Sequence, residues 1–139
     1  MNARECSVRN EYLASLERGA DWRDELEEFA AREDVGAAWF SGTGTVDDAE
    51  VWFYDRDDLE YRSVTFDEPL EVAAAQGTVT LLDGDPFART HAVLSRESGQ
   101  ALAGYLDAAT VFSGEVYLRV FEEPISRTHD GTTGLDRIP

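Results

Sequence analysis

Residues 86–106 form the stretch that most constrains the fold, because they contain two extended apolar runs joined by a short polar loop. The runs cover residues 87–94 and 100–106, and the loop of residues 95–99 ends in a glycine. Two such runs separated by a few turn-forming residues are typical of a β-hairpin. The first run contains His91, one of two histidines in the chain. The sequence therefore predicts paired antiparallel strands that carry a histidine at the centre of the fold.

Most of the remaining chain also divides into short extended runs separated by turn signals. The clearest hairpin pairs residues 49–54 with residues 60–66 across the turn cluster Asp-Arg-Asp-Asp. The dipeptide Asp83-Gly84 predicts another hairpin turn. Further strands are expected at residues 11–16, 37–41, 70–75, 78–82 and 111–121.

The Gly-Thr-Gly sequence at residues 42–44 has two interpretations. It resembles a phosphate-binding loop, but it lacks the further glycine and the lysine of a P-loop and the full dinucleotide-binding pattern. The favoured interpretation is a tight turn between strands. Gly77 is likewise interpreted as the break between two separate strands.

One helix is predicted over residues 22–33. Asp21 is a suitable N-cap, and the apolar side chains of Trp22, Leu26, Phe29 and Ala30 repeat at helical spacing. The helix is expected to end near Gly36. With about seven or eight strands and one or two helices, the fold class is α+β, with a largely antiparallel twisted sheet.

The chain is long enough for one domain. Its 139 residues are 42% hydrophobic, which supports a single core. We expect a loose arm at residues 1–10, a domain at residues 11–121 and a polar tail of turns or disorder at residues 122–139. No apolar run reaches the roughly 20 residues of a membrane helix, no signal peptide is visible, and Cys6 is the only cysteine. A cytoplasmic location is the expectation.

The charge of the chain is strongly acidic. The formal net charge is −17, from 29 acidic and 12 basic residues, and every basic residue is an arginine. An acidic surface without lysine is typical of proteins from extreme halophiles, whereas an acidic protein from a GC-rich genome is the simpler alternative. Non-specific DNA binding requires cations that displace counterions from phosphates, so the charge argues against it.

The central stretch resembles the signature of the plants and prokaryotes conserved (PPC) domain, whose pattern reads roughly P-F-x-H-x-H, an acidic turn, then G-G-H-L. The matching residues are Pro86, Phe87, His91, Gly99, Gly104 and Leu106. The departures are Arg89 in place of the first histidine, Ala103 in place of the first glycine and Tyr105 in place of the last histidine. The order of elements over residues 11–121 also resembles the family.

The resemblance implies a sheet flanked by helices and a homotrimer of the free-standing prokaryotic type, here from a haloarchaeon. In plants the domain follows an AT-hook, and it assembles subunits and recruits partner proteins. Prokaryotic members are described as candidate DNA-binding proteins because of that likeness. This chain contains no Arg-Gly-Arg-Pro hook.

Strand alternation places Arg89, His91 and Val93 on one face of their strand. Three histidines at the family positions would resemble a divalent metal site, but arginine has no acceptor atom and protonated tyrosine is a poor ligand. The sequence therefore predicts no metal and no other cofactor. It also predicts no catalytic residue, because His91 has no accompanying nucleophile motif.

Three interpretations of this face stay open. Arg89, His91 and Tyr105 could form a small anion-binding pocket. Glu71 and Glu115, which match family positions, could instead pair with Arg89 and His91 and join subunits. The plainest interpretation is a half-buried histidine beside a rim arginine.

The strand at residues 111–121 is expected to direct Phe112, Val116, Leu118 and Val120 to one face. Aromatic side chains on both faces of two strands suggest an interface between subunits. The residues expected there are Trp52, Tyr54, Tyr117, Arg119 and Phe121, with Glu115 and Arg119 near a three-fold contact.

The leading functional hypothesis is a non-enzymatic trimer that acts through protein partners in a DNA-associated or transcription-regulatory role. The alternatives are a trimer that binds a small anion or catalyses a reaction near His91, and direct DNA binding by the trimer.

Overall fold

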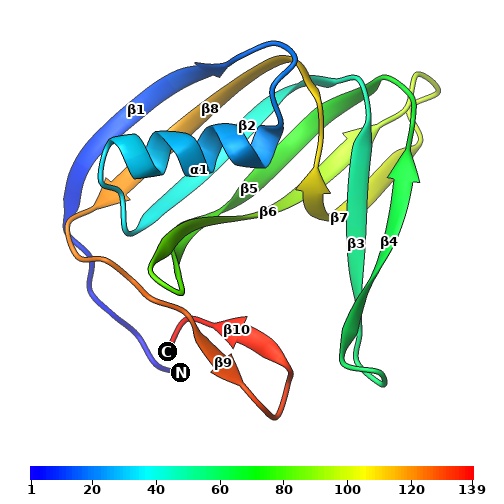
Figure 1. The fold of residues 1–139 in the computed structure, drawn as a ribbon. Coiled ribbons are helices and arrows are strands. Elements are labelled where there is room, and N and C mark those ends of the chain that lie inside the picture. Colours follow the sequence, from blue (N-terminus) through cyan, green and yellow to red (C-terminus); the bar gives the residue numbers. More distant parts are fainter.

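The computed structural model describes all of residues 1–139, and it contains one helix packed on one face of an eight-stranded sheet (Figure 1). The strand order is β1-β8-β2-β5-β6-β7-β3-β4, and every neighbouring pair is antiparallel. The strands are β1 (Val8–Leu16), β2 (Ala38–Val46), β3 (Ala49–Asp55), β4 (Glu60–Phe66), β5 (Leu70–Leu82), β6 (Asp85–Ser95), β7 (Ala101–Ala108) and β8 (Val111–Phe121). The predicted α+β class with a largely antiparallel sheet is confirmed.

The predicted helix is present as α1 (Trp22–Arg32). The Asp21 carboxylate accepts hydrogen bonds from the backbone N–H groups of Arg23 and Asp24, as an N-cap does. Leu26 and Ala30 are buried against the sheet together with Trp22. No second helix is present.

Neither Gly42 nor Gly77 lies in a break between strands. Both predictions were wrong for the same reason. Gly42 lies within β2, where an added Cβ would come within 2.7 Å of Val116 and 3.3 Å of the Trp22 ring. Gly77 lies within the single continuous strand β5, where an added Cβ would come within 1.8 Å of the Arg89 carbonyl oxygen. These glycines allow close approach of neighbouring groups instead of reversing the chain.

The hairpin turns were predicted correctly. Asp83 and Gly84 both have positive φ, 52° and 86°, as a tight turn between β5 and β6 requires. Strand β1 begins three residues before the expected position, so the N-terminal arm is shorter. Phe112 was expected to share a face with Val116, Leu118 and Val120, but it is exposed whereas they are buried, because the pairing of β2 with β8 shifts register beside it.

The C-terminal tail contains the expected turn at residues 131–134, but short strands that were not predicted flank this turn. It forms a two-stranded hairpin of β9 (Thr128–Asp130) and β10 (Leu135–Arg137). Two backbone hydrogen bonds connect Leu81 of β5 to Ile125 and Arg127. The tail therefore pairs with the end of β5 that extends beyond β2, and Figure 1 shows the hairpin beside both chain termini.

The core lies between α1 and the sheet, and its largest buried side chains include Trp22, Phe40 and Leu118. The opposite face of the sheet is not covered by a helix, and we call it the open face. No helix of the structure has the length and apolarity that a membrane span requires.

Candidate functional site

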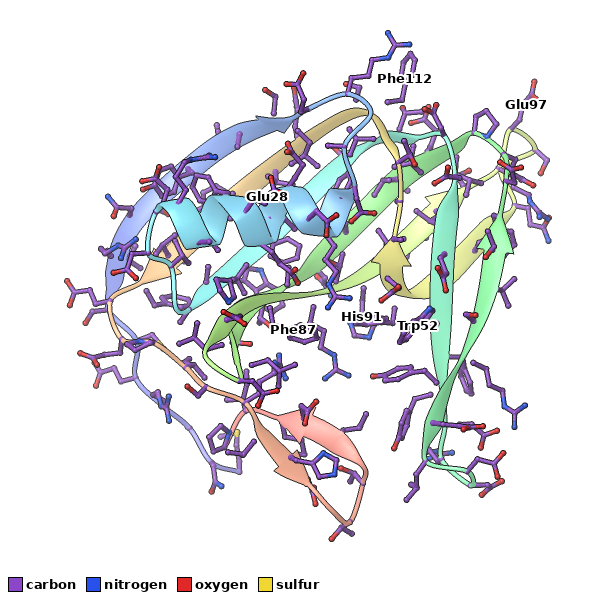
Figure 2. All side chains as sticks on the ribbon, viewed as in Figure 1. Glu28, Trp52, Phe87, His91, Glu97 and Phe112 are labelled. Atoms are coloured by element: carbon purple, nitrogen blue, oxygen red, sulfur yellow. The ribbon has the colours of Figure 1, made fainter.

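A pocket of about 230 Å³ lies where β6 and β7 separate, and we call it the arginine pocket. Its walls come from α1, five strands and the β9–β10 hairpin, so distant parts of the chain converge there. The charged lining residues are Arg23, Arg89, Asp107 and Asp136, and the aromatic ones are Trp52, Tyr61, Phe87 and Tyr105. Figure 2 shows Phe87 between α1 and the β9–β10 hairpin, with Trp52 beside β3 and His91 between these two side chains.

The pocket exists because β6 pairs with β7 over only part of its length. The pairing runs from His91 to Ser95 and leaves the first half of β6 without a strand on that side. The Glu27 carboxylate of α1 accepts a hydrogen bond at 3.0 Å from the backbone N–H of Ala88, which has no strand partner on that side. Arg23 then bridges Glu27 at 2.8 Å and Asp107 at 2.9 Å. The helix thus closes the gap between the two strands with charged side chains.

Aromatic rings line the pocket around Tyr105, which is buried. Its ring centroid lies 5.6 Å from that of Tyr61, 6.0 Å from that of Trp52 and 5.8 Å from that of His91. Tyr54 continues the cluster at 4.9 Å from Tyr61. Burial raises the pKa of the Tyr105 hydroxyl, so this tyrosine is protonated at neutral pH.

Two arginines beside the pocket have no acidic partner. Arg89 lies 5.9 Å from the centre of the Tyr105 ring, and its only side-chain hydrogen bond is a long one of 3.4 Å to the Tyr61 hydroxyl. Arg127 donates to the hydroxyls of Thr80 and Thr78 and to the Asp136 backbone carbonyl. Burial, followed by repulsion from Arg89, lowers the pKa of Arg127. Neither cation forms an ion pair with a carboxylate, although the nearby Asp136 offsets part of the charge of Arg127.

The structure brings Arg89, His91 and Tyr105 together, but it does not bring Glu71 or Glu115 to them. Glu71 lies opposite Ser95, at the far end of β6 from Arg89. Glu115 is on β8, which two strands separate from β6. Strand order therefore places both acids away from the histidine within one chain, and their pairing between subunits stays a prediction.

His91 lies at the rim of the pocket and is exposed. Burial of part of its ring and repulsion from Arg89 lower the pKa of His91, which favours the neutral imidazole.

The sequence reasoning missed Arg23, Asp107 and Arg127 as members of this region. Arg23 lies outside the apolar stripe of the predicted helix, and Arg127 lies in the tail. Neither position carries a motif, because the approach of Arg23 depends on where β7 diverges from β6 and that of Arg127 on the pairing of the tail with β5.

The residues expected at a subunit interface fall into two groups. Trp52 and Tyr54 pack within the chain, and the Tyr54 hydroxyl donates to the Thr133 carbonyl. Tyr117, Arg119 and Phe121 lie on the open face, where Tyr117 and Arg119 both donate to Glu11.

The open face also carries an apolar groove of about 550 Å³ that Trp39, Phe121 and Ile125 help to line. Leu13 is 86% exposed, Trp39 43% and Val93 41%. Large apolar side chains thus stand in solvent on three strands of one face.

The donor atoms near His91 do not fit a metal ion. Its neighbours on the adjacent strands are Gln76 and Tyr105, and Arg89 lies two residues before it on β6. No three histidine, cysteine, aspartate or glutamate side chains cluster as a metal would require. A guanidinium has no lone pair to donate, so the most prominent group beside His91 repels a cation instead of binding it.

The fold resembles solved structures over nearly its whole length. A metal-containing protein from Archaeoglobus fulgidus is 32% identical with a TM-score of 0.95, and the alignment covers 100% of this chain and 99% of that one. A plant- and prokaryote-conserved (PPC) protein from Pyrococcus horikoshii is 25% identical with a TM-score of 0.92, covering 99% and 97%. A candidate DNA-binding protein from Ralstonia eutropha JMP134 is 25% identical with a TM-score of 0.87, covering 92% and 90%.

No protein with a curated description matches the chain. The family model of the Plants and Prokaryotes Conserved domain, abbreviated PCC or PPC, matches residues 3–122. This match covers most of the chain and agrees with the resemblance of the central stretch. The chain therefore belongs to the Plants and Prokaryotes Conserved domain family.

Proposed function

We propose that this protein is a non-enzymatic assembly domain that forms a homotrimer and acts through protein partners in a DNA-associated, regulatory role. The observation that carries the proposal is the open face of the sheet, where Leu13, Trp39 and Val93 are exposed around an apolar groove. Exposed apolar patches of this kind mark protein interaction sites. A second copy of the chain is the occupant that the family resemblance favours.

The negative charge of the chain opposes its self-association. A net charge of −17 makes copies of the chain repel one another at low salt, so the apolar contact has to outweigh that repulsion. Tyr117, Arg119 and Phe121 lie on the same face and belong to the proposed interface. Salt screens the repulsion between acidic surfaces, and we infer that the protein works in a salt-rich cytoplasm, as in a haloarchaeon.

Direct DNA binding is the weaker alternative. Six of the twelve arginines form ion pairs with carboxylates of the same chain, which leaves few cations for phosphate contacts. A gel-shift series over rising salt tests this alternative, and a retained band with an arbitrary duplex would favour DNA contact by the domain itself.

A matched pair of surface substitutions tests the assembly role. Leu13→Glu places a charge on the open face, whereas Phe112→Glu places the same charge on an exposed side chain that points away from the fold in Figure 2. We expect Leu13→Glu to shift the protein towards monomer in analytical ultracentrifugation and Phe112→Glu to leave its mass unchanged. Equal behaviour of the two variants would contradict assembly through the open face.

A further inference from the structure

The geometry points to the arginine pocket as a binding site for a small organic carboxylate with an apolar body, held by Arg89 beside Arg127. Arg89 lies on the same face of β6 as Val93, but the inference rests on other observations than the assembly role does. The inference rests on uncompensated charge, on free hydrogen-bond donors and on the apolar lining.

The first observation concerns charge. In a chain with 29 acidic residues, Arg89 and Arg127 are the two half-buried arginines without a carboxylate within 4.0 Å. A partly buried charge without a partner is unfavourable, and two neighbouring cations repel each other. Arg89 lines the pocket and Arg127 lies beside it, so an anion bound at Arg89 would offset its charge and reduce the repulsion between the two cations.

The second observation concerns donors. A guanidinium has five N–H donors in a planar fork, and Arg89 uses one of them in a 3.4 Å contact with Tyr61. Arg127 is held in place by neutral oxygens of Thr78, Thr80 and the Asp136 backbone, so its charge is available although its position is fixed. A planar carboxylate matches such a fork with two parallel hydrogen bonds.

The third observation is the pairing of Arg23. Its guanidinium is occupied by Glu27 and Asp107, so it stabilises the pocket wall and does not serve as a further anion ligand. Asp107 and Asp136 also line the pocket, and Asp107 is the acid that Arg23 pairs with. A doubly charged phosphate would be repelled by that carboxylate more than a singly charged carboxylate would, which favours the monoanion.

The apolar residues that line the pocket determine the size and character of the uncharged part of the ligand. Trp52, Tyr61, Phe87 and Leu135 present apolar surface to the cavity. Its volume of about 230 Å³ is below the roughly 300–1,000 Å³ of pockets for drug-sized ligands. A carboxylate on a single ring or a short branched chain fits this space.

The probe is sodium benzoate, and the readout is the set of three tryptophan indole N–H signals in ¹⁵N-labelled protein. Trp52 lines the pocket, whereas Trp22 is in the core and Trp39 is on the open face. We expect benzoate, at constant chloride, to shift the Trp52 signal saturably and to leave the Trp22 signal unmoved. Benzamide, the neutral analogue, and inorganic phosphate are expected to leave Trp52 unmoved.

Variants separate recognition by Arg89 from a general charge effect. Arg89→Gln is expected to weaken benzoate binding by about tenfold or more, because a charge-assisted hydrogen bond contributes about 1.5–3 kcal/mol. Arg32→Gln removes the same charge from an exposed helix position and should bind as the unmutated protein does. The Trp22 and Trp39 signals report whether each variant is folded.

The outcomes that would overturn the inference are definite. The site would be refuted if benzoate caused no shift of the Trp52 signal. It would also be refuted if the folded Arg89→Gln variant bound benzoate as tightly as the unmutated protein does. Binding of phosphate without benzoate would refute the carboxylate class.

Discussion

Replacement of Asp21 tests how α1 is attached to the sheet where β6 and β7 separate. One carboxylate oxygen of Asp21 accepts hydrogen bonds from the backbone N–H groups of Arg23 and Asp24, each at 3.0 Å. The other oxygen accepts one from Ala109 at 3.0 Å, just beyond the end of β7. Asp21→Ala removes the cap and the connection to the sheet together.

The expected decrease in the free energy of unfolding follows from these two lost interactions. Loss of an N-cap costs about 1 kcal/mol, and a hydrogen bond to a charged group contributes about 1.5–3 kcal/mol. The sum is about 3 kcal/mol for Asp21→Ala. At about 3–4 °C per kcal/mol for a chain of this length, the melting temperature should fall by about 10 °C.

Asp21→Asn separates the two terms. Asparagine caps helices as well as aspartate does, but its amide nitrogen cannot accept the Ala109 hydrogen bond. We therefore expect Asp21→Asn to lose only the second term, about 2 kcal/mol.

The assay is urea unfolding in molar KCl at one protein concentration, with Glu97→Gln, at the exposed loop labelled in Figure 2, as the control for a lost negative charge. A free energy of unfolding for Asp21→Ala within about 0.5 kcal/mol of the control, the usual scatter of surface substitutions, would refute the reasoning.

Three further predictions concern salt, metal and pH. The melting temperature should rise from low to molar KCl, because salt screens repulsion within a chain of net charge −17; a flat or falling trend would contradict the halophilic assignment. Protein purified without chelator should contain well under one zinc per chain by elemental analysis, and stoichiometric zinc would overturn this prediction. The double variant Arg89→His with Tyr105→His adds histidines around His91, so it should gain zinc affinity. Arg137 and the Thr132 backbone N–H lower the pKa of Asp130 to about 2, so its stabilising contribution should be complete above the ordinary aspartate pKa and be lost as the pH falls towards 2. An NMR titration should find the Asp130 pKa nearer its ordinary value in Arg137→Gln, and an unchanged value would remove Arg137 as the cause.

Local patterns in the sequence predicted the elements whose conformation is decided locally. The cap at Asp21, the stripe of Trp22 and Leu26, and the turn at Asp83-Gly84 each act within a few residues, and the structure confirms all three. Gly42 and Gly77 could not be interpreted this way. Glycine suits a turn and a close approach equally well, and the groups that approach them, Val116 and Arg89, are distant in sequence.

The candidate site was predictable in part for the same reason. Arg89 and His91 share a face because strand alternation is local, and Tyr105 joins them because β6 and β7 form a short hairpin. Arg127 is brought in by the tail, whose pairing with β5 depends on how far β5 extends beyond β2. Glu71 and Glu115 were misplaced because a family pattern does not specify strand order.

The replacement of a histidine by Arg89 has a clear chemical consequence. A site of neutral imidazoles attracts a cation, whereas a guanidinium attracts an anion, so one substitution reverses the charge of the ligand that this face accepts. The relative from Archaeoglobus fulgidus is metal-containing, and the present chain shares its fold with an arginine at this position.

The central claim is assembly through the open face, and the mass of the unmutated protein in solution tests it most directly. Size-exclusion chromatography with light scattering in molar KCl gives that mass without reference to shape. The chain has a mass of 15.4 kDa, and the account predicts a particle three times heavier. A mass equal to that of one chain over the whole concentration range would contradict it.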